Sequence, residues 1–445
     1  MADVGWGLAD GGGGRLRVGS TSAGLWLGAV LAAVGSAVAA RALGVEQYGA
    51  VILAVAMVSS IRSFVDLTLE EAVVHHGFRA LAADDVGQLA QILRVAIVVD
   101  VVLGVAVAGG VVLVAGPIAS LAGAGNLDPA FVRLAALCGL VTTADGTTGA
   151  VMLLAGRPDL RAWVTLLVAL VRLVLIVAAV HIGDARMVLV VFAVAGGIGS
   201  AVQALMSWRI GWRHWRAHKP LVARRWAREL GRFGVHSSAT TSVIAAKGGL
   251  VALALARSGG PALVGTLQVA MLPVTVATVL SGPVRLVLLP EQARMAAAGA
   301  RDGLRRSILA FSRIAVAVGV PGALVGWVLM PRLIVGFYSH RFDGAIGPAR
   351  ILLVAAVAHL AVAWSKTLPG AVGRPQLRTL ASLVELVVTL ALLAFLAPHG
   401  PAGAAAAFSG ASVVVAVVWW RSAMGVIAGV GDAGSMGSPA VAGST

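Results

Sequence analysis

Long apolar runs are the feature of this chain that most restricts its fold. A helix rises 1.5 Å per residue, so about 20 apolar residues cross a bilayer core once. Apolar residue types make up 59% of the 445 residues and charged types 12%, which excludes a soluble domain and predicts an all-α polytopic membrane protein. Twelve spans are predicted, at 20–40, 48–69, 90–114, 130–154, 161–181, 187–208, 235–256, 263–286, 308–331, 348–369, 377–397 and 403–421.

Three sequence blocks recur once, in the same order, about half a chain apart. Residues 40–54 return at 256–270, residues 79–83 at 294–298, and GRPDLR (156–161) as GRPQLR (373–378). Chance identity in a chain rich in Ala and Gly is the alternative, so the Gly, Arg and Pro matches carry most weight. A duplicated hydrophobic unit predicts two pseudo-symmetric six-helix lobes, a plan found in many secondary transporters.

Basic residues orient the chain. With both termini in the cytoplasm, about 21 of the 34 Lys and Arg lie in inside loops and tails and about 7 in outside loops, which fits the positive-inside rule for a multi-pass protein of the cytoplasmic membrane. We expect mobile tails, two lobes and a basic cytoplasmic linker, with the bounds 1–19 (tail), 20–208 (N-lobe), 209–234 (linker), 235–421 (C-lobe) and 422–445 (tail).

The segment 208–232 is the most basic part of the chain, with eight Lys or Arg, one acid and interleaved Trp. Such a pattern can bind nucleic acid by stacking. Here it joins the two predicted lobes, where Trp at headgroup level and Arg on anionic lipid explain it. We therefore expect membrane lipids as partners and no nucleic acid.

Several function classes are excluded or disfavoured. The longest outside loops, 115–129 and 332–347, leave no room for a catalytic domain, and no GxxxxGK[ST] phosphate loop is present. The adjacent His75 and His76 cannot share a helix face, and no further ligand stands at metal-binding spacing. The single cysteine, Cys138, excludes an internal disulfide. We expect no cofactor, no metal and no enzymatic activity.

Ionisable residues inside predicted spans are candidate functional residues, because burying charge in a bilayer is costly. Arg62 lies thirteen residues after Gly49 and Lys247 thirteen before Gly260, which places both about 20 Å below the outer face. Two cations at one depth in opposite halves would suit a phosphate or pyrophosphate group. The alternative is that Arg62 pairs with Asp66, one turn on, and that Lys247 binds a carbonyl group.

A third cation and several acids complete the set of candidates. Arg285, near the inner end of its span, either joins the anion site or extends to the cytoplasmic surface. Asp100, Asp145 and Arg172 lie at similar depths on adjacent spans, where they would form structural ion pairs or supply a carboxylate for proton or Na⁺ coupling. Glu385 lies about one turn from the repeat equivalent of Arg172.

The first span pair, ending RALGVEQYGAVILA, resembles polysaccharide-export flippases of the multidrug/oligosaccharidyl-lipid/polysaccharide exporter (MOP) superfamily. The likeness runs over about 20–420, and its motifs are Arg41, Leu43-Gly44, Tyr48-Gly49, Pro290, Arg294, Gly373-Arg374-Pro375 and PHGPAGAAAA at 398–407. It implies two lobes in a V around a central cavity lined by spans 1, 2, 7 and 8.

The resemblance also implies a function. Such a protein transports a polyprenyl-diphosphate-linked oligosaccharide from the inner to the outer leaflet by alternating access, beside glycosyltransferases or a polymerase of the same pathway. The diphosphate would fall to Arg62 and Lys247, with Arg285 as a further candidate. Twelve spans argue against the lipid II flippases, which usually have fourteen. Two alternatives stay open: a proton- or Na⁺-coupled multidrug exporter of the same fold, and a membrane glycan polymerase or ligase.

Overall fold

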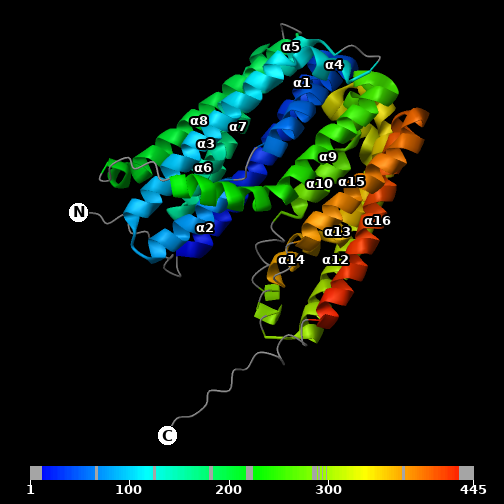
Figure 1. The fold of residues 1–445 in the computed structure, drawn as a ribbon. Coiled ribbons are helices and arrows are strands. Elements are labelled where there is room, and N and C mark those ends of the chain that lie inside the picture. Colours follow the sequence, from blue (N-terminus) through cyan, green and yellow to red (C-terminus); the bar gives the residue numbers. More distant parts are fainter. Residues whose placement is uncertain are drawn as a thin grey trace. The chain divides into compact units, whose positions relative to one another are not determined.

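The computed structural model describes residues 13–65, 69–123, 127–179, 184–216, 224–282, 288, 291, 292, 294–296, 298–372 and 376–429. All regular elements in these ranges are helices, so the predicted all-α class is confirmed (Figure 1). The chain divides into two compact units. The first runs to Gly265 and includes Phe337–Arg341, and the second contains Thr266–Gly336 and continues from Phe342.

The first unit is built from α1 (Gly13–Val65), α2 (Leu69–Ala82), α3 (Val86–Leu113), α4 (Ala115–Ser120), α5 (Pro129–Val141), α6 (Asp145–Leu154), α7 (Pro158–Ala179), α8 (Ala185–Arg216) and most of α9 (Arg224–Ala270). Local signals set the helix starts: Asp85 caps α3 by accepting from the Gln88 N–H, and Asp128 caps α5, whose first residue is proline. α7 packs between α1 and α8, and α8 also packs on α5.

The second unit contains α10 (Leu272–Leu280), α12 (Arg301–Tyr338), η2 (His340–Ala345), α13 (Ile346–Ala361), η3 (Ala363–Lys366), α14 (Leu368–Ala371), α15 (Gln376–Leu396), η4 (Ala397–His399) and α16 (Gly400–Gly429). Its core surrounds the fully buried Trp364, whose ring meets Trp419 and Trp420 edge to face. The Trp364 indole N–H donates to Ser312 Oγ at 3.0 Å, so its polar atom is satisfied.

Nine helical segments in the described ranges are long and apolar enough to cross a bilayer. Trp26–Phe64 (39 residues) and Gln376–Gly425 (50 residues) each exceed one crossing of about 20 residues and each cover two predicted spans. Left-handed backbone interrupts both segments, at Gly44 (φ 75°) and Gly400 (φ 83°). The predicted span 263–286 is shared between α9 and α10. The multi-span fold is therefore confirmed, and the count of twelve stays a prediction.

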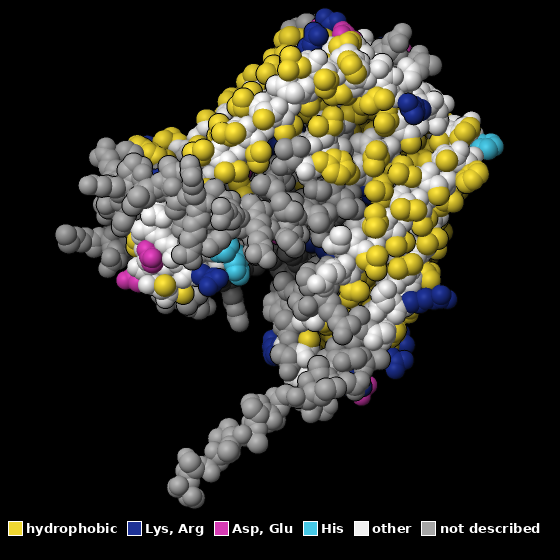
Figure 2. All heavy atoms as spheres, viewed as in Figure 1, with side chains coloured by type: hydrophobic (Ala, Val, Ile, Leu, Met, Phe, Trp, Pro, Cys, Tyr) yellow, Lys and Arg dark blue, Asp and Glu magenta, His cyan; other side chains and the backbone are white. Residues whose placement is uncertain are grey.

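The outward faces of the helices are apolar. Val98, Val102 and Val105 on α3, and Val318 and Val328 on α12, are each more than half exposed. Figure 2 shows hydrophobic side chains over most of the visible described surface. Water would penalise such a surface and lipid would not, so the exposed residues support a membrane environment as directly as the sequence does.

The backbone repeats with the sequence. Gly44 and Gly260, which are 216 residues apart, share the unusual conformations φ 75°, ψ −179° and φ 68°, ψ −173°. Two further pairs with positive φ stand at the same spacing: Asp84 with Gly299, and Gly123 with Ser339. Because positive φ is uncommon outside glycine, this recurrence supports the duplication independently of residue identity.

The predicted domain bounds stay predictions. α1 begins at Gly13 and α16 continues to Gly429, so helix extends into both predicted tails. The rest of the tails, residues 217–223 and the side chains of most of the linker 209–234 lie outside the described residues. The two compact units divide after Gly265, which assigns most of α9 to the first unit.

Candidate functional site

The predicted span 130–154 is broken in its middle, and Arg62 binds at the break. α5 ends at Val141, and α6 begins at Asp145. Arg62 Nη1 donates to Gly139 O at 2.7 Å and to Thr142 Oγ1 at 2.9 Å, and Nη2 donates to Thr142 O at 3.2 Å. The last carbonyl groups of a helix lack intrahelical partners and carry partial negative charge. The Arg62 guanidinium therefore caps the carboxyl end of α5.

Lys247 is half-buried on α9, close to a contact between α9 and α1. The Gly249 N–H donates to Ser60 Oγ at 2.9 Å, and a Cβ added to Gly249 would lie 2.2 Å from that oxygen. Lys247 and Arg62 each lie two residues from this contact, so the two helices meet at the level of both cations. Two residues turn a helical side chain by about 200°, so the contact does not aim the cations at each other. The convergence of the two side chains stays a prediction.

Two of the predicted site residues, Asp66 and Arg285, lie outside the described residues. Glu385 is half-buried on α15 in the second unit, and its backbone carbonyl accepts from the Thr389 hydroxyl at 2.6 Å. The roles assigned to these three residues stay predictions.

The two acids predicted in the first half have separate surroundings. Asp100 on α3 is 5% exposed and accepts a hydrogen bond from Thr147 Oγ1 of α6 at 2.5 Å. Asp145, the first residue of α6, accepts from Ser200 Oγ of α8 at 2.6 Å. Hydroxyl donors thus partly replace water around both carboxylates and tie α6 to α3 and to α8.

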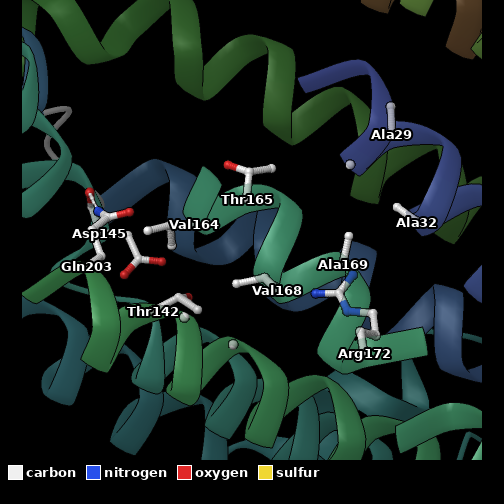
Figure 3. Close-up of a pocket in the computed structure, with 13 residues that line it drawn as sticks. Ala29, Ala32, Thr142, Asp145, Val164, Thr165, Val168, Ala169, Arg172 and Gln203 are labelled. Carbon is white, nitrogen blue, oxygen red and sulfur yellow. Dashed lines mark hydrogen bonds between the residues drawn. The ribbon is translucent and has the colours of Figure 1, made fainter. Parts of the chain in front are cut away.

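Asp145 and Arg172 line one pocket of about 420 Å³ among α1, α6, α7 and α8. Figure 3 shows Asp145 at one end, beside Gln203, and Arg172 at the other, beside Ala169. The two charges form no ion pair among the described residues. Instead the Arg172 guanidinium lies over the Phe192 ring, 4.5 Å from its centroid, a cation–π contact. The arrangement places one positive and one negative group on a shared cavity inside the bundle.

Sequence reasoning missed Gln203, which is 6% exposed and completes the Asp145 end of the pocket. Its Nε2 donates to the Asp145 backbone carbonyl at 2.6 Å and to Thr148 Oγ1 at 2.8 Å. The available signal was a polar amide within the apolar stretch of α8, because such residues inside spans mark polar networks.

Sequence reasoning also missed an ion pair between α2 and α7. Arg161 meets the Glu70 carboxylate with both terminal nitrogens, with Nη2 to Oε2 at 3.0 Å. Arg161 is the last residue of the repeated GRPDLR block, which indicated duplication but not a partner. In the first half, this arginine joins two helices.

The comparisons with known proteins agree with one another. The family model described as "Polysaccharide biosynthesis protein" matches residues 17–295, more than half of the chain. An inward-facing multidrug resistance MATE family transporter of the MOP superfamily superposes with TM-score 0.68 and 16% identity, over 91% of this chain and 96% of that one. The lipid II flippase MurJ, in an inward closed conformation, superposes with TM-score 0.71 and 12% identity, over 92% and 89%.

A MOP superfamily transporter from Pyrococcus furiosus is also similar, with TM-score 0.63 and 14% identity over 93% of this chain and 96% of that one. No curated protein sequence matches. At these identities the solved structures establish the fold, which is that of MOP superfamily transporters.

Proposed function

This chain belongs to the polysaccharide biosynthesis protein family, and we propose that it is a flippase for a lipid-linked oligosaccharide. The substrate class is a polyprenyl-diphosphate-linked glycan, moved from the inner to the outer leaflet of the cytoplasmic membrane for cell-surface polysaccharide synthesis. The family match carries the proposal, and the fold shared with a lipid II flippase supports it. Glycosyltransferases or a polymerase of the same pathway are the proposed partners.

The proposed transport cycle is alternating access. Similar MATE transporters are known in inward-facing and outward-facing conformations, which supports this mode for the fold. The polyprenyl tail stays in the bilayer while the charged head crosses between the lobes, so only the head needs a polar path. Both termini are placed in the cytoplasm on the arginine bias alone.

Arg62 and Lys247 are the proposed headgroup residues, with Arg285 as a third candidate. The supporting observation is the contact between their helices at Ser60 and Gly249. A diphosphate carries several negative oxygens, and two fixed cations would offset the cost of moving them into low dielectric. Since Arg62 also caps α5, its guanidinium is held in place before substrate arrives.

Proteoliposomes containing a fluorescent polyprenyl-diphosphate disaccharide test the site. We expect the double variant Arg62→Gln, Lys247→Gln to lose at least tenfold in flipping rate, the loss that about 1.4 kcal/mol at the transition state produces. Gln retains hydrogen-bond donors for the α5 carbonyls, which protects the fold. Arg133→Gln, an exposed arginine of α5, is the matched control. Wild-type flipping by the folded double variant would remove both residues from the site.

The pocket supports a second candidate, ion-coupled export of small drugs by the same fold. Asp145 faces a cavity of about 420 Å³ inside the bundle, where a titratable carboxylate would serve proton or Na⁺ coupling. Transport measured with and without imposed proton and Na⁺ gradients separates the candidates. Drug efflux that needs a gradient and fails in Asp145→Asn, with no glycan flipping by the wild type, would favour the exporter.

A further inference from the structure

The long helix α12 packs loosely within the second unit. Only 6% of its most apolar 18-residue stretch is buried, compared with 22–50% in the other eight candidate spans of the described ranges. A groove of about 450 Å³ lies between α12 and α13 and also touches Val413 of α16. This volume is large enough for a small-molecule ligand or a lipid chain.

The groove is apolar along its length. Its walls are aliphatic side chains on two helices, chiefly Val320, Ala323, Leu324, Leu353, Val357 and Ala358. On α12 it runs from Val320 to Trp327 and on α13 from Arg350 to Ala358, which at 1.5 Å per residue is about 10–12 Å. The hydrocarbon half of one leaflet is about 15 Å thick, so the groove matches most of one lipid chain.

A single cation closes one end of the groove. Arg350 Nε donates to the Trp327 backbone carbonyl at 3.0 Å, and its guanidinium carbon lies 5.3 Å from the centroid of the Trp327 ring. No carboxylate pairs with Arg350 in the part of the chain that the structure describes, and its two terminal nitrogens make no hydrogen bond there. These nitrogens form the fork that fits two phosphate oxygens.

Trp327 has the position expected of an interfacial residue. It lies four residues before the end of the predicted span 308–331, and Arg350 follows the start of the next span, 348–369, by two residues. Tryptophan is enriched at the headgroup level, where a polar ring edge meets apolar lipid. The charged end of the groove therefore lies at a membrane surface, and the apolar end lies within the bilayer.

We propose that this groove binds one acyl chain of an anionic phospholipid, whose phosphate group lies on the Arg350 guanidinium. The aliphatic walls match the chain, the length matches its depth, and the fixed cation matches the headgroup. A zwitterionic lipid offers the same phosphate but adds a cationic amine, so Arg350 binds it less favourably. The site is independent of the proposed glycan path.

Photocrosslinking tests the proposal in the whole protein. Purified protein in detergent is incubated with phosphatidylglycerol carrying a diazirine on its acyl chain, and labelled peptides are identified by mass spectrometry. We expect label on α12 and α13, and competition by unlabelled phosphatidylglycerol about fivefold better than by phosphatidylcholine with the same chains, the preference expected from one arginine.

Three variants locate the interaction. Arg350→Gln should remove the headgroup preference, and Ala323→Phe should fill the groove and abolish its label. Arg332→Gln changes another arginine near the same end of α12, outside the groove, and should behave as wild type. The proposal is overturned if Arg350→Gln keeps the fivefold preference, if Ala323→Phe keeps the label, or if polyprenyl phosphate competes and phosphatidylglycerol does not.

Discussion

Gly49 of α1 and Gly265 of α9 lie against each other, although 216 residues separate them. The contact is reciprocal. A Cβ on Gly49 would lie 1.8 Å from the Pro261 carbonyl oxygen, and one on Gly265 would lie 2.2 Å from the Val45 carbonyl oxygen. Val45 and Pro261 are themselves 216 residues apart. The two copies of the repeat therefore cross at equivalent positions, about a local two-fold axis.

Alanine at either glycine should destabilise the protein, because the clashing atoms are backbone and cannot rotate away. We expect Gly49→Ala and Gly265→Ala each to lower the free energy of unfolding by about 1–3 kcal/mol, the usual cost of overpacking. Thermal unfolding of the purified variants measures this. Gly109→Ala on α3 is the control, since nothing lies within 4 Å of its added Cβ. Equal stability of all three variants would contradict the close crossing.

Ser339 should become more favourable as glycine. Its φ is 87°, whereas its repeat equivalent at φ 80° is Gly123. Its hydroxyl is also buried with no hydrogen-bond partner among the described residues. Removing the left-handed strain and the unsatisfied group should stabilise Ser339→Gly by about 1 kcal/mol, after the entropy of an added glycine is subtracted. The reverse change, Gly123→Ser, should destabilise. A lower melting temperature for Ser339→Gly would count against this account.

The ion pair between Glu70 and Arg161 should show measurable coupling. A double-mutant cycle with Glu70→Gln and Arg161→Gln is expected to give about 1 kcal/mol, because the pair is two-pronged and part-buried and joins two helices. The same cycle on Arg157 and Asp159, which are two residues apart and more exposed, serves as control and should give about 0–0.5 kcal/mol. Coupling of the control pair equal to that of the first would show that the contact between α2 and α7 adds nothing.

Asp128 should make stability depend on pH in the acid range. The hydrogen bond from the Ala130 N–H, and then the neighbouring Arg186, lower the pKa of this carboxyl below its ordinary value. A depressed folded-state pKa stabilises the protein above the unfolded value of about 3.9, and the contribution disappears as pH falls through the folded value. The melting temperature of wild type should exceed that of Asp128→Asn at pH 6 and approach it towards pH 3. A constant difference over that range would refute the assignment.

Long-range contacts account for the parts of the site that the sequence did not predict. Depth along the chain placed Arg62 and Lys247 at one level, and the contact between Ser60 and Gly249 agrees with that level. The binding of Arg62 at the carboxyl end of α5 needed two further facts: that the span breaks after Val141, and that α5 lies beside α1. Neither fact has a local signal, since an apolar run does not mark where its helix is interrupted.

The sequence by itself determined the all-helical membrane class and the duplication, because apolar length and residue identity are properties of single segments. Only the tertiary structure decided that Asp145 and Arg172 share a pocket without pairing, and that Gln203 belongs to the same place. The physical reason is rotational. A side chain's partners depend on how its helix is turned and which helix lies next to it, and packing between distant segments sets both.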